Sequence, residues 1–241
     1  MQGRARLGGL VGSNAKPVSV PIDADRRVSG LLLAPGQARA CLVLAHGAGA
    51  GMTHPFMAAV AAELAQRGIA TLRYQFPYME QHGKRPDPPK LAHATVRAAA
   101  AEAARLLPKL PLFAGGKSFG GRMTSQAQAT APLAGVCGLV FLGFPLHPAR
   151  RPSRERAQHL SDVAIPMLFL QGTRDALALP DEIGPVCQAL GKRAVLKFVP
   201  DADHSFHVPA RTGRKDAQVR SELMETVASW IDGMIGTRLV P

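Results

Sequence analysis

The chain has 241 residues, of which 46% are hydrophobic and 5% aromatic, a length that can bury a substantial aliphatic core in one large domain or two small ones. Its net charge of +12 comes from scattered cations with one local cluster, Arg150 to Arg156, and a basic stripe with interleaved aromatics is absent, which argues against a nucleic-acid partner. No run of about 18 uncharged apolar residues occurs, so no membrane span is predicted, and Cys41, Cys137 and Cys187 are too widely spaced to suggest a disulfide framework.

The N-terminal segment shows no export signal. Arg4 and Arg6 precede a short glycine-rich patch at residues 7–12, which falls short of the apolar run of about 7–15 residues that a secretory signal needs. We therefore expect residues 1–16 to form a flexible tail and residues 17–241 to form a single domain. The expected compartment is the cytoplasm.

The first half of the domain alternates short apolar runs with helical patterns. Strands are predicted at three such runs: 28–33, 41–45 and 69–73. A helix is predicted after Thr53, a possible N-cap, and should end at Gly68. Pro77 and the proline-rich stretch 86–89 predict a loop. An alanine-rich helix should follow at 91–107, stopped by Pro108.

The second half continues the alternation. Strands are predicted at residues 112–114, 138–142, 167–171 and 194–199, and helices at 119–130 and 215–235. Strands separated by helices of this length predict an α/β fold with a doubly wound, mostly parallel sheet and helices on both faces. The proline- and arginine-rich connection after strand 138–142 holds roughly twenty residues, too few for a large lid.

A glycine-flanked serine lies between predicted strand 112–114 and predicted helix 119–130. Gly116-Lys117-Ser118-Phe119-Gly120 matches G-x-S-x-G, a pattern that exposes a serine hydroxyl on a strained strand-to-helix turn. The sequence Gly-Lys-Ser also ends a phosphate-binding loop pattern. The first glycine of that pattern would stand at position 111, which is Pro111, so we favour a nucleophilic serine over a nucleotide site.

A serine hydroxyl needs a base to become a good nucleophile. Asp175 follows predicted strand 167–171 and His204 follows predicted strand 194–199. This order favours a catalytic triad in which His204 takes the proton of Ser118 and Asp175 holds the histidine tautomer. Asp175 could instead be a turn-forming carboxylate, and His204 a surface-loop histidine.

Other polar residues near His204 are expected to have structural roles. Asp201 and Asp203 lie on the same loop and should shape it. His207 forms an H-x-x-H pair with His204, but no third ligand has suitable spacing, so neither a metal nor another cofactor is predicted.

Acyl transfer also needs donors for the developing oxyanion. The backbone N–H of Phe119 is the first candidate. The second should come from residues 46–51, which we call the glycine loop, with Ala48 favoured and Gly49 next. His46 is expected to hold this loop through a side-chain hydrogen bond, although the loop could also be a simple tight turn.

Side chains that follow two further strands are candidates for the substrate pocket. Tyr78, Phe144 and Leu146 are predicted to form its walls. Arg73 is a candidate for binding an anionic substrate group, although a structural salt bridge is its favoured role. Without a large lid, the pocket should be open and suit small or flexible acyl substrates.

Six segments together resemble one branch of the α/β-hydrolase superfamily related to dienelactone hydrolases: HGAGAGM, RYQFPYME, GGKSFGGRM, GFPLHP, LFLQGTRD and DADHSF. That branch includes bacterial predicted hydrolases and a domain shared by a non-specific-lethal histone acetyltransferase complex subunit and a testis-expressed protein. The resemblance covers about residues 18–235 and implies nucleophile, acid and base at Ser118, Asp175 and His204. Dienelactone hydrolases proper carry cysteine where Ser118 stands, which favours an ester or thioester hydrolase.

The sequence thus predicts a serine hydrolase that cleaves a small-molecule ester or thioester through an acyl-serine intermediate, without a nucleic-acid or membrane partner. The alternative is a non-catalytic α/β-hydrolase-like interaction module, because some relatives in this branch look like scaffold domains of larger complexes.

Overall fold

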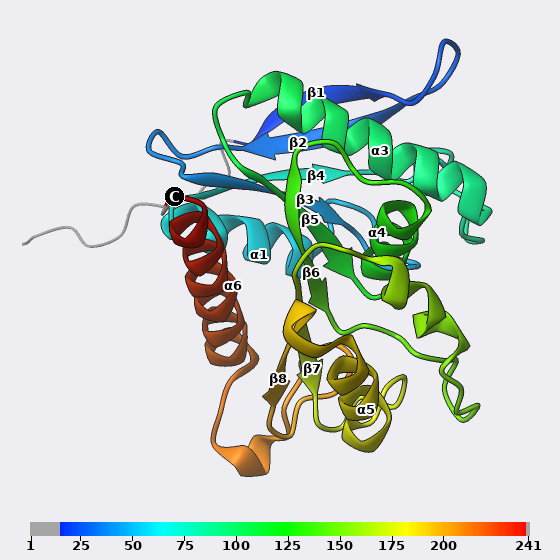
Figure 1. The fold of residues 1–241 in the computed structure, drawn as a ribbon, viewed down its shortest axis with the longest axis vertical. Helices are drawn as coiled ribbons and strands as arrows, with labels where there is room; N and C mark the ends of the chain where they lie inside the picture. The colour runs from blue at the N-terminus through cyan, green and yellow to red at the C-terminus, as the bar shows by residue number, and fades with distance from the viewer. Residues whose placement is uncertain (1–14, 240–241) are drawn as a thin grey trace, which may run out of the picture.

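The computed structural model describes residues 15–239 (Figure 1). The strands are β1 (Lys16–Pro21), β2 (Arg27–Leu33), β3 (Ala40–Ala45), β4 (Ile69–Tyr74), β5 (Leu112–Lys117), β6 (Val136–Leu142), β7 (Met167–Gly172) and β8 (Ala194–Val199). The α-helices are α1 (Pro55–Gln66), α2 (Pro77–Glu80), α3 (Pro89–Leu106), α4 (Phe119–Thr130), α5 (Pro180–Leu190) and α6 (Asp216–Leu239). Three short 3₁₀ segments are η1 (Glu155–Asp162), η2 (Gly191–Arg193) and η3 (Ala210–Thr212).

The strands form one sheet in the order β1-β2-β4-β3-β5-β6-β7-β8. Strands β3 to β8 pair in parallel, whereas β2 runs antiparallel to both β1 and β4. The predicted doubly wound, mostly parallel sheet is therefore confirmed. All six parallel strands end at the same edge, so the loops that follow them are brought together there.

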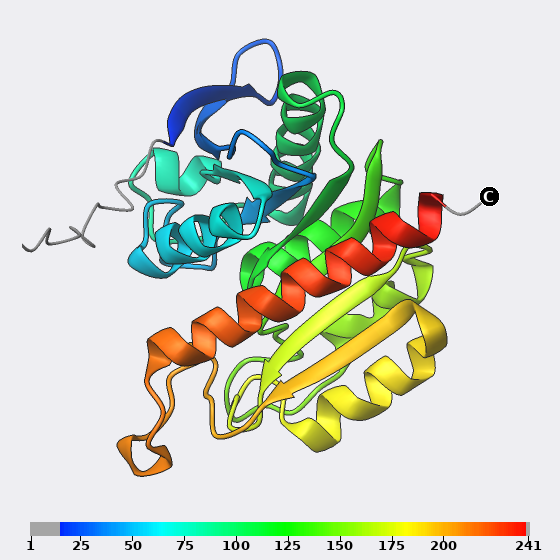
Figure 2. The same cartoon turned by 90° about the vertical axis from the view of Figure 1, so that its left-hand side faces the viewer.

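Helices cover both faces of the sheet. Helices α1 and α6 lie on one face, and α3, α4 and α5 lie on the other (Figure 1). Figure 2 shows α6, in orange and red, lying along its face of the sheet with its axis roughly aligned with strands β7 and β8. Strand β3 illustrates the resulting pattern: its residues alternate between the two faces, and all six are buried. Burial on both faces explains why the parallel strands read as continuous apolar runs in the sequence.

The topology places two loops at the centre of the sheet. Strand β3 lies between β4 and β5, so the chain leaves β3 towards one side and returns to its other side after α3. Ligands of open α/β sheets bind at such a reversal, beyond the carboxyl ends of the strands. The glycine loop after β3 and the turn after β5 are therefore neighbours at this point.

Several elements differ from the sequence prediction. The tail predicted over residues 1–16 lies largely outside the described residues, and its last residue, Lys16, begins edge strand β1. The loop predicted at Pro77 begins the single helical turn α2, because proline suits the first position of a helix. Helix α1 is capped by His54 rather than Thr53, since the His54 Nδ1 accepts a hydrogen bond from the Phe56 N–H at 3.2 Å. The connection between β6 and β7 contains η1 and no large lid.

No helix within residues 15–239 combines the length and the apolarity that crossing a bilayer requires.

Candidate active site

Ser118 occupies the turn between β5 and α4 with a strained backbone. Its φ of 49° and ψ of −114° lie in a region that non-glycine residues rarely adopt. The Ser118 carbonyl accepts the Arg122 N–H at 3.1 Å, which starts α4 immediately after the serine. This turn forces close backbone approach, because a Cβ atom on Gly120 would lie 2.5 Å from the His46 carbonyl oxygen.

Replacing Gly120 by alanine should therefore destabilise the fold. The added methyl group would collide with backbone of the glycine loop, and overpacking of this kind lowers the free energy of unfolding by about 1–3 kcal/mol. Urea denaturation of the variant measures the effect. Gly233→Ala is the matched control, because nothing lies within 4 Å of its added methyl in α6 and alanine is favoured in a helix by about 0.5–1 kcal/mol. Equal or greater stability of Gly120→Ala would contradict the tight-turn geometry.

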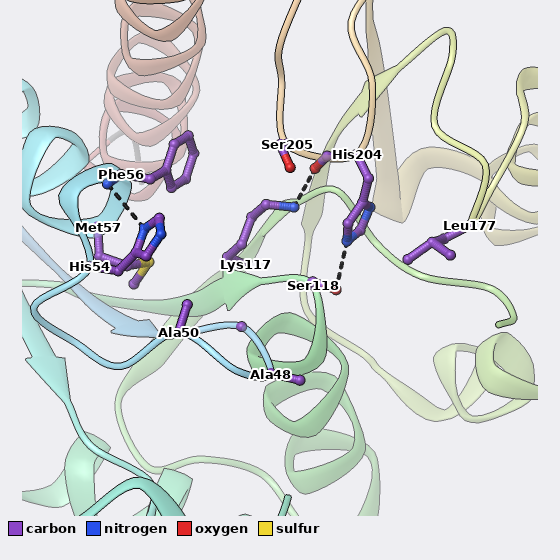
Figure 3. A pocket seen from close by; sticks show the side chains of 11 residues that line it. Ala48, Ala50, His54, Phe56, Met57, Lys117, Ser118, Leu177, His204 and Ser205 are labelled. Atoms are coloured by element: carbon purple, nitrogen blue, oxygen red, sulfur yellow. Dashed lines mark hydrogen bonds between the residues drawn. The ribbon is translucent and has the colours of Figure 1, made fainter. Parts of the chain in front are cut away.

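Three side chains from separate strand ends form one hydrogen-bonded chain. The His204 Nε2 lies 2.8 Å from the Ser118 Oγ, and the His204 Nδ1 lies 2.7 Å from the Asp175 Oδ2. Figure 3 shows His204 directed at Ser118. The side chain of Asp175 is fully buried, whereas that of His204 is 26% exposed. In the neutral tautomer that fits this chain, Nδ1–H donates to the carboxylate and Nε2 accepts the serine proton.

The buried Asp175 carboxylate is held on both oxygens. The Gln171 Nε2 donates to Oδ2 at 2.6 Å, and the Leu177 N–H donates to Oδ1 at 2.9 Å. These bonds compensate the loss of hydration of a buried charge. Asp175 therefore does both things that the sequence allowed: its carboxylate stabilises its own turn through the Leu177 N–H, and it also contacts His204. Sequence analysis missed Gln171, whose signal was a polar residue at the end of an otherwise apolar strand.

The loop that carries His204 is fixed at several points. The Lys117 Nζ donates to the His204 carbonyl oxygen at 2.5 Å, and burial lowers the pKa of Lys117 to about 8. Asp203 accepts hydrogen bonds from the backbone N–H groups of Ser205 and His207, which is the loop-shaping role expected for it. His207 itself pairs with Asp216 at 2.9 Å, and its side chain is 62% exposed.

No group of three or more histidine, cysteine or carboxylate side chains within residues 15–239 is arranged to hold a metal ion.

His46 fixes the glycine loop as expected. It is fully buried, its Nε2 accepts the Phe76 N–H at 3.0 Å, and its Nδ1 lies 2.8 Å from the Gly47 carbonyl oxygen. Burial lowers the pKa of His46, so the ring is neutral, with Nδ1–H donating to Gly47. The loop is therefore held by a buried side chain.

The predicted oxyanion donors lie around Ser118. Phe119 is the first residue of α4, where backbone N–H groups have no partner within the helix. Ala48 lines the same pockets as Ser118. Gly49 lines neither of these pockets. This difference favours Ala48 over Gly49, and both donor assignments stay predictions.

Ser118 opens onto a pocket of about 470 Å³, which we call the Ser118 pocket. Figure 3 shows His54, Phe56 and Met57 on one side of the serine and Leu177 on the other. The lining residues are Gly47, Ala48, Ala50, His54, Phe56, Met57, Lys117, Ser118, Leu177, His204 and Ser205. The apolar walls thus come from the start of α1 and from the loop after β7.

The structure corrects the predicted pocket walls. Phe144 and Leu146 are fully buried, and the Phe144 ring packs against Phe141 at a centroid distance of 5.3 Å. Tyr78 is 5% exposed and packs against the Phe119 ring instead of lining the Ser118 pocket. A residue that comes directly after a parallel strand lies at the edge of the sheet where the active site is. The direction of its side chain, however, depends on the conformation of the turn.

Arg73 takes neither of its predicted roles. It is 3% exposed, and its Nη1 donates to the Met52 carbonyl oxygen at 2.9 Å. It forms no salt bridge with a carboxylate of residues 15–239. A backbone carbonyl is the partner, and no sequence pattern could have indicated this.

A second serine–histidine pair lies on the α3–α5 face of the sheet. The Ser125 Oγ is 2.7 Å from the His159 Nε2 and donates to the Arg122 carbonyl oxygen at 2.9 Å. Ser125 is fully buried within α4 and lines neither pocket at Ser118. Because a substrate in either pocket does not reach this buried hydroxyl, we interpret the pair as structural.

The His159 ring makes stability depend on pH. Burial lowers the pKa of His159 to about 4, and the charge of Arg122 adds to the effect. The unfolded chain binds a proton at about pH 6.5, so stability is lost as the pH falls from about 6.5 towards 4. Thermal unfolding at pH 7 and pH 4.5 should show a larger drop in Tm for wild type than for His159→Gln. Equal drops would rule out His159 as a source of acid sensitivity.

Comparisons with known proteins agree with this architecture. A sequence model of the family described as "Alpha/beta hydrolase domain" matches residues 38–232. The chain is similar in structure to a dienelactone hydrolase from Anabaena variabilis, with 22% identity over 91% of this chain and 97% of that one and a TM-score of 0.73. It is also similar to XC6422 from Xanthomonas campestris, described as a serine hydrolase without a lid, with 20% identity over 92% and 98% of the two chains and a TM-score of 0.69. Est1E from Butyrivibrio proteoclasticus gives 15% identity over 91% and 99% and a TM-score of 0.67.

Proposed function

Because the chain belongs to the family of alpha/beta hydrolase domains, we propose that it is a serine hydrolase that cleaves small carboxylic esters or thioesters. The observation that carries the proposal is the unbroken hydrogen-bonded chain from the Ser118 Oγ through His204 to the buried Asp175 carboxylate. The first residue of this hydrogen-bonded series, Ser118, lies on a strained turn and lines an open pocket. This combination activates a hydroxyl where a substrate reaches it.

The first half of the reaction forms an acyl-serine. The Ser118 Oγ attacks the carbonyl carbon of the substrate while the His204 Nε2 accepts the hydroxyl proton. Asp175 stabilises the imidazolium through Nδ1–H. The negative charge on the carbonyl oxygen is stabilised by the N–H of Phe119 and, in this proposal, that of Ala48. Collapse of the tetrahedral intermediate breaks the bond to the leaving alcohol or thiol, which takes the proton from His204.

The second half releases the acid. Water enters the open pocket, His204 removes its proton, and the resulting hydroxide attacks the acyl carbon through a second tetrahedral intermediate. The Ser118 oxygen leaves and recovers its proton from His204. The 26% exposure of the His204 side chain supports this step, because solvent water reaches the base without a lid movement.

Hydrolysis of a graded set of substrates tests the proposal. The set contains p-nitrophenyl esters and acyl-thioesters of increasing chain length, assayed with folded wild-type protein. We expect saturable hydrolysis that is proportional to protein concentration and strongest for short chains, because the Ser118 pocket holds about 470 Å³. Absence of turnover for the whole set would contradict the proposal and favour a non-catalytic interaction module of the kind that some resembling domains form.

A further inference from the structure

A second pocket meets Ser118 from the other side. It has a volume of about 390 Å³ and shares Ala48, Ser118 and Leu177 with the Ser118 pocket. Its remaining walls come from the loop before α3 and the start of that helix, from α4, from the loop after β6 and from η1: Pro86, Asp87, Pro89, Phe119, Arg122, Met123, Pro145 and Arg156. We call it the arginine pocket. A molecule bound at Ser118 can therefore extend into both pockets.

Arg122 brings a positive charge into this pocket without a partner. Its Nε is buried and has no hydrogen-bond acceptor. Its guanidinium lies 5.9 Å from the centroid of the Phe119 ring. Among residues 15–239, neither Arg122 nor Arg156 forms an ion pair with a carboxylate. A buried donor on a cation is unfavourable unless an acceptor reaches it.

The two guanidinium groups also repel each other. Burial lowers the pKa of Arg122 to about 10, and the charge of Arg156 adds to this. The carboxyl group of Asp87 is the acid that lines the pocket, and its Oδ2 already accepts the Tyr78 N–H at 3.1 Å. The pocket thus has two positive groups, Arg122 and Arg156, and one negative group, Asp87, and a singly charged anion would neutralise the excess positive charge.

The other arginines of the local cluster lie elsewhere. Arg151 and Arg154 are exposed and do not line this pocket. Arg156 is half-buried on η1 and faces it. The positive charge of the pocket therefore comes from Arg122 and Arg156, and not from the cluster as a whole.

We propose that Arg122 and Arg156 bind a carboxylate of the substrate, so that the enzyme prefers esters that carry a carboxylate on either the acyl or the leaving group. This inference rests on the proposed hydrolase function. Guanidinium groups bind carboxylates through paired, charge-assisted hydrogen bonds. The apolar walls at Phe56, Met57 and Leu177 would take the uncharged part of the same molecule. The substrate class is thus a half-ester of a dicarboxylic acid or an ester of a carboxylated alcohol.

Matched ester pairs test the preference. On the acyl side, mono-p-nitrophenyl adipate is compared with p-nitrophenyl hexanoate; on the leaving-group side, 4-carboxyphenyl acetate is compared with 4-carbamoylphenyl acetate. The readout is the ratio of kcat/KM for the anionic ester to that for its neutral partner. We expect a wild-type ratio above one for at least one pair and a fall of about 10- to 100-fold in Arg122→Gln, the range of hydrogen bonds to charged groups.

Two more variants complete the test. Arg156→Gln should lower the same ratio and reports on the pocket if Arg122→Gln does not fold. Arg151→Gln removes one exposed charge from the same cluster and should leave the ratio unchanged. A wild-type ratio of one or less for both pairs, or ratios in Arg122→Gln and Arg156→Gln equal to that in Arg151→Gln, would overturn the inference.

A binding measurement separates this inference from the proposed function. If wild type hydrolyses no ester, the proposed function fails, and calorimetric titration of the wild-type protein with monomethyl adipate decides the inference. It stands if the ligand binds and Arg156→Gln raises Kd by about tenfold or more. It falls if the ligand does not bind or if the Kd is the same in Arg156→Gln and Arg151→Gln.

Discussion

Replacing Ser118 by alanine should lower kcat/KM for any ester that the wild-type protein hydrolyses by about 10⁴- to 10⁶-fold. The variant lacks the oxygen that attacks the carbonyl, while the oxyanion donors and the pocket remain. A small residual rate over water is therefore expected. The fold should be unchanged, because Ser118 bonds to the rest of the structure through its backbone and through the single contact of its Oγ with His204. Steady-state kinetics with circular dichroism as a folding check measures both expectations.

Ser125→Ala is the matched control. Ser125 lies in the same helix region and also contacts a histidine, but it is fully buried and away from the Ser118 pocket. Its removal should leave kcat/KM close to that of wild type. If Ser118→Ala retains most of the wild-type rate, or if Ser125→Ala loses it, the nucleophile is not Ser118.

His204→Ala should cause a loss of similar size, about 10⁴- to 10⁶-fold in kcat/KM. Without the imidazole, the Ser118 hydroxyl keeps its proton at neutral pH and the leaving group has no acid. Because the two residues act as a unit, the double variant Ser118→Ala/His204→Ala should be no slower than either single variant by more than a small factor. The double-variant comparison distinguishes a shared step from two independent contributions.

His207→Ala controls for the loop itself. His207 lies three residues further along, is exposed, and pairs with Asp216 at the surface. Its removal should leave turnover largely unchanged. Near-wild-type hydrolysis by His204→Ala would show that His204 is not the catalytic base, whatever the result for His207→Ala.

The sequence predicted those elements whose signals are strong and local. Helix α4 and strand β8 begin and end at the residues that the sequence predicted. The meeting of Ser118, Asp175 and His204 was also predictable, since parallel strands end at one edge and each residue follows a strand. This prediction needed only the order of the residues along the chain and the predicted alternation of strands and helices.

Side-chain direction and unpaired groups were not predictable in the same way. Phe144 and Leu146 follow the correct strand, yet the turn after β6 directs both into the core. Arg73 meets a backbone carbonyl, a partner that no residue pattern reveals. The importance of Arg122 depends on the absence of an acceptor around its Nε, and only the packed structure contains that information. The chemistry of the pockets therefore depends on side-chain packing that the residue pattern alone does not reveal.

The nucleophilic role of Ser118 is tested most directly by the site at which a fluorophosphonate probe attaches to the folded wild-type protein. Such probes react with serines that a neighbouring base has activated. Intact-mass measurement should show one added probe, and peptide mapping should place it on Ser118, with labelling lost in Ser118→Ala and retained in Ser125→Ala. An unlabelled, well-folded wild-type protein, or a probe attached to a different residue, would contradict the account.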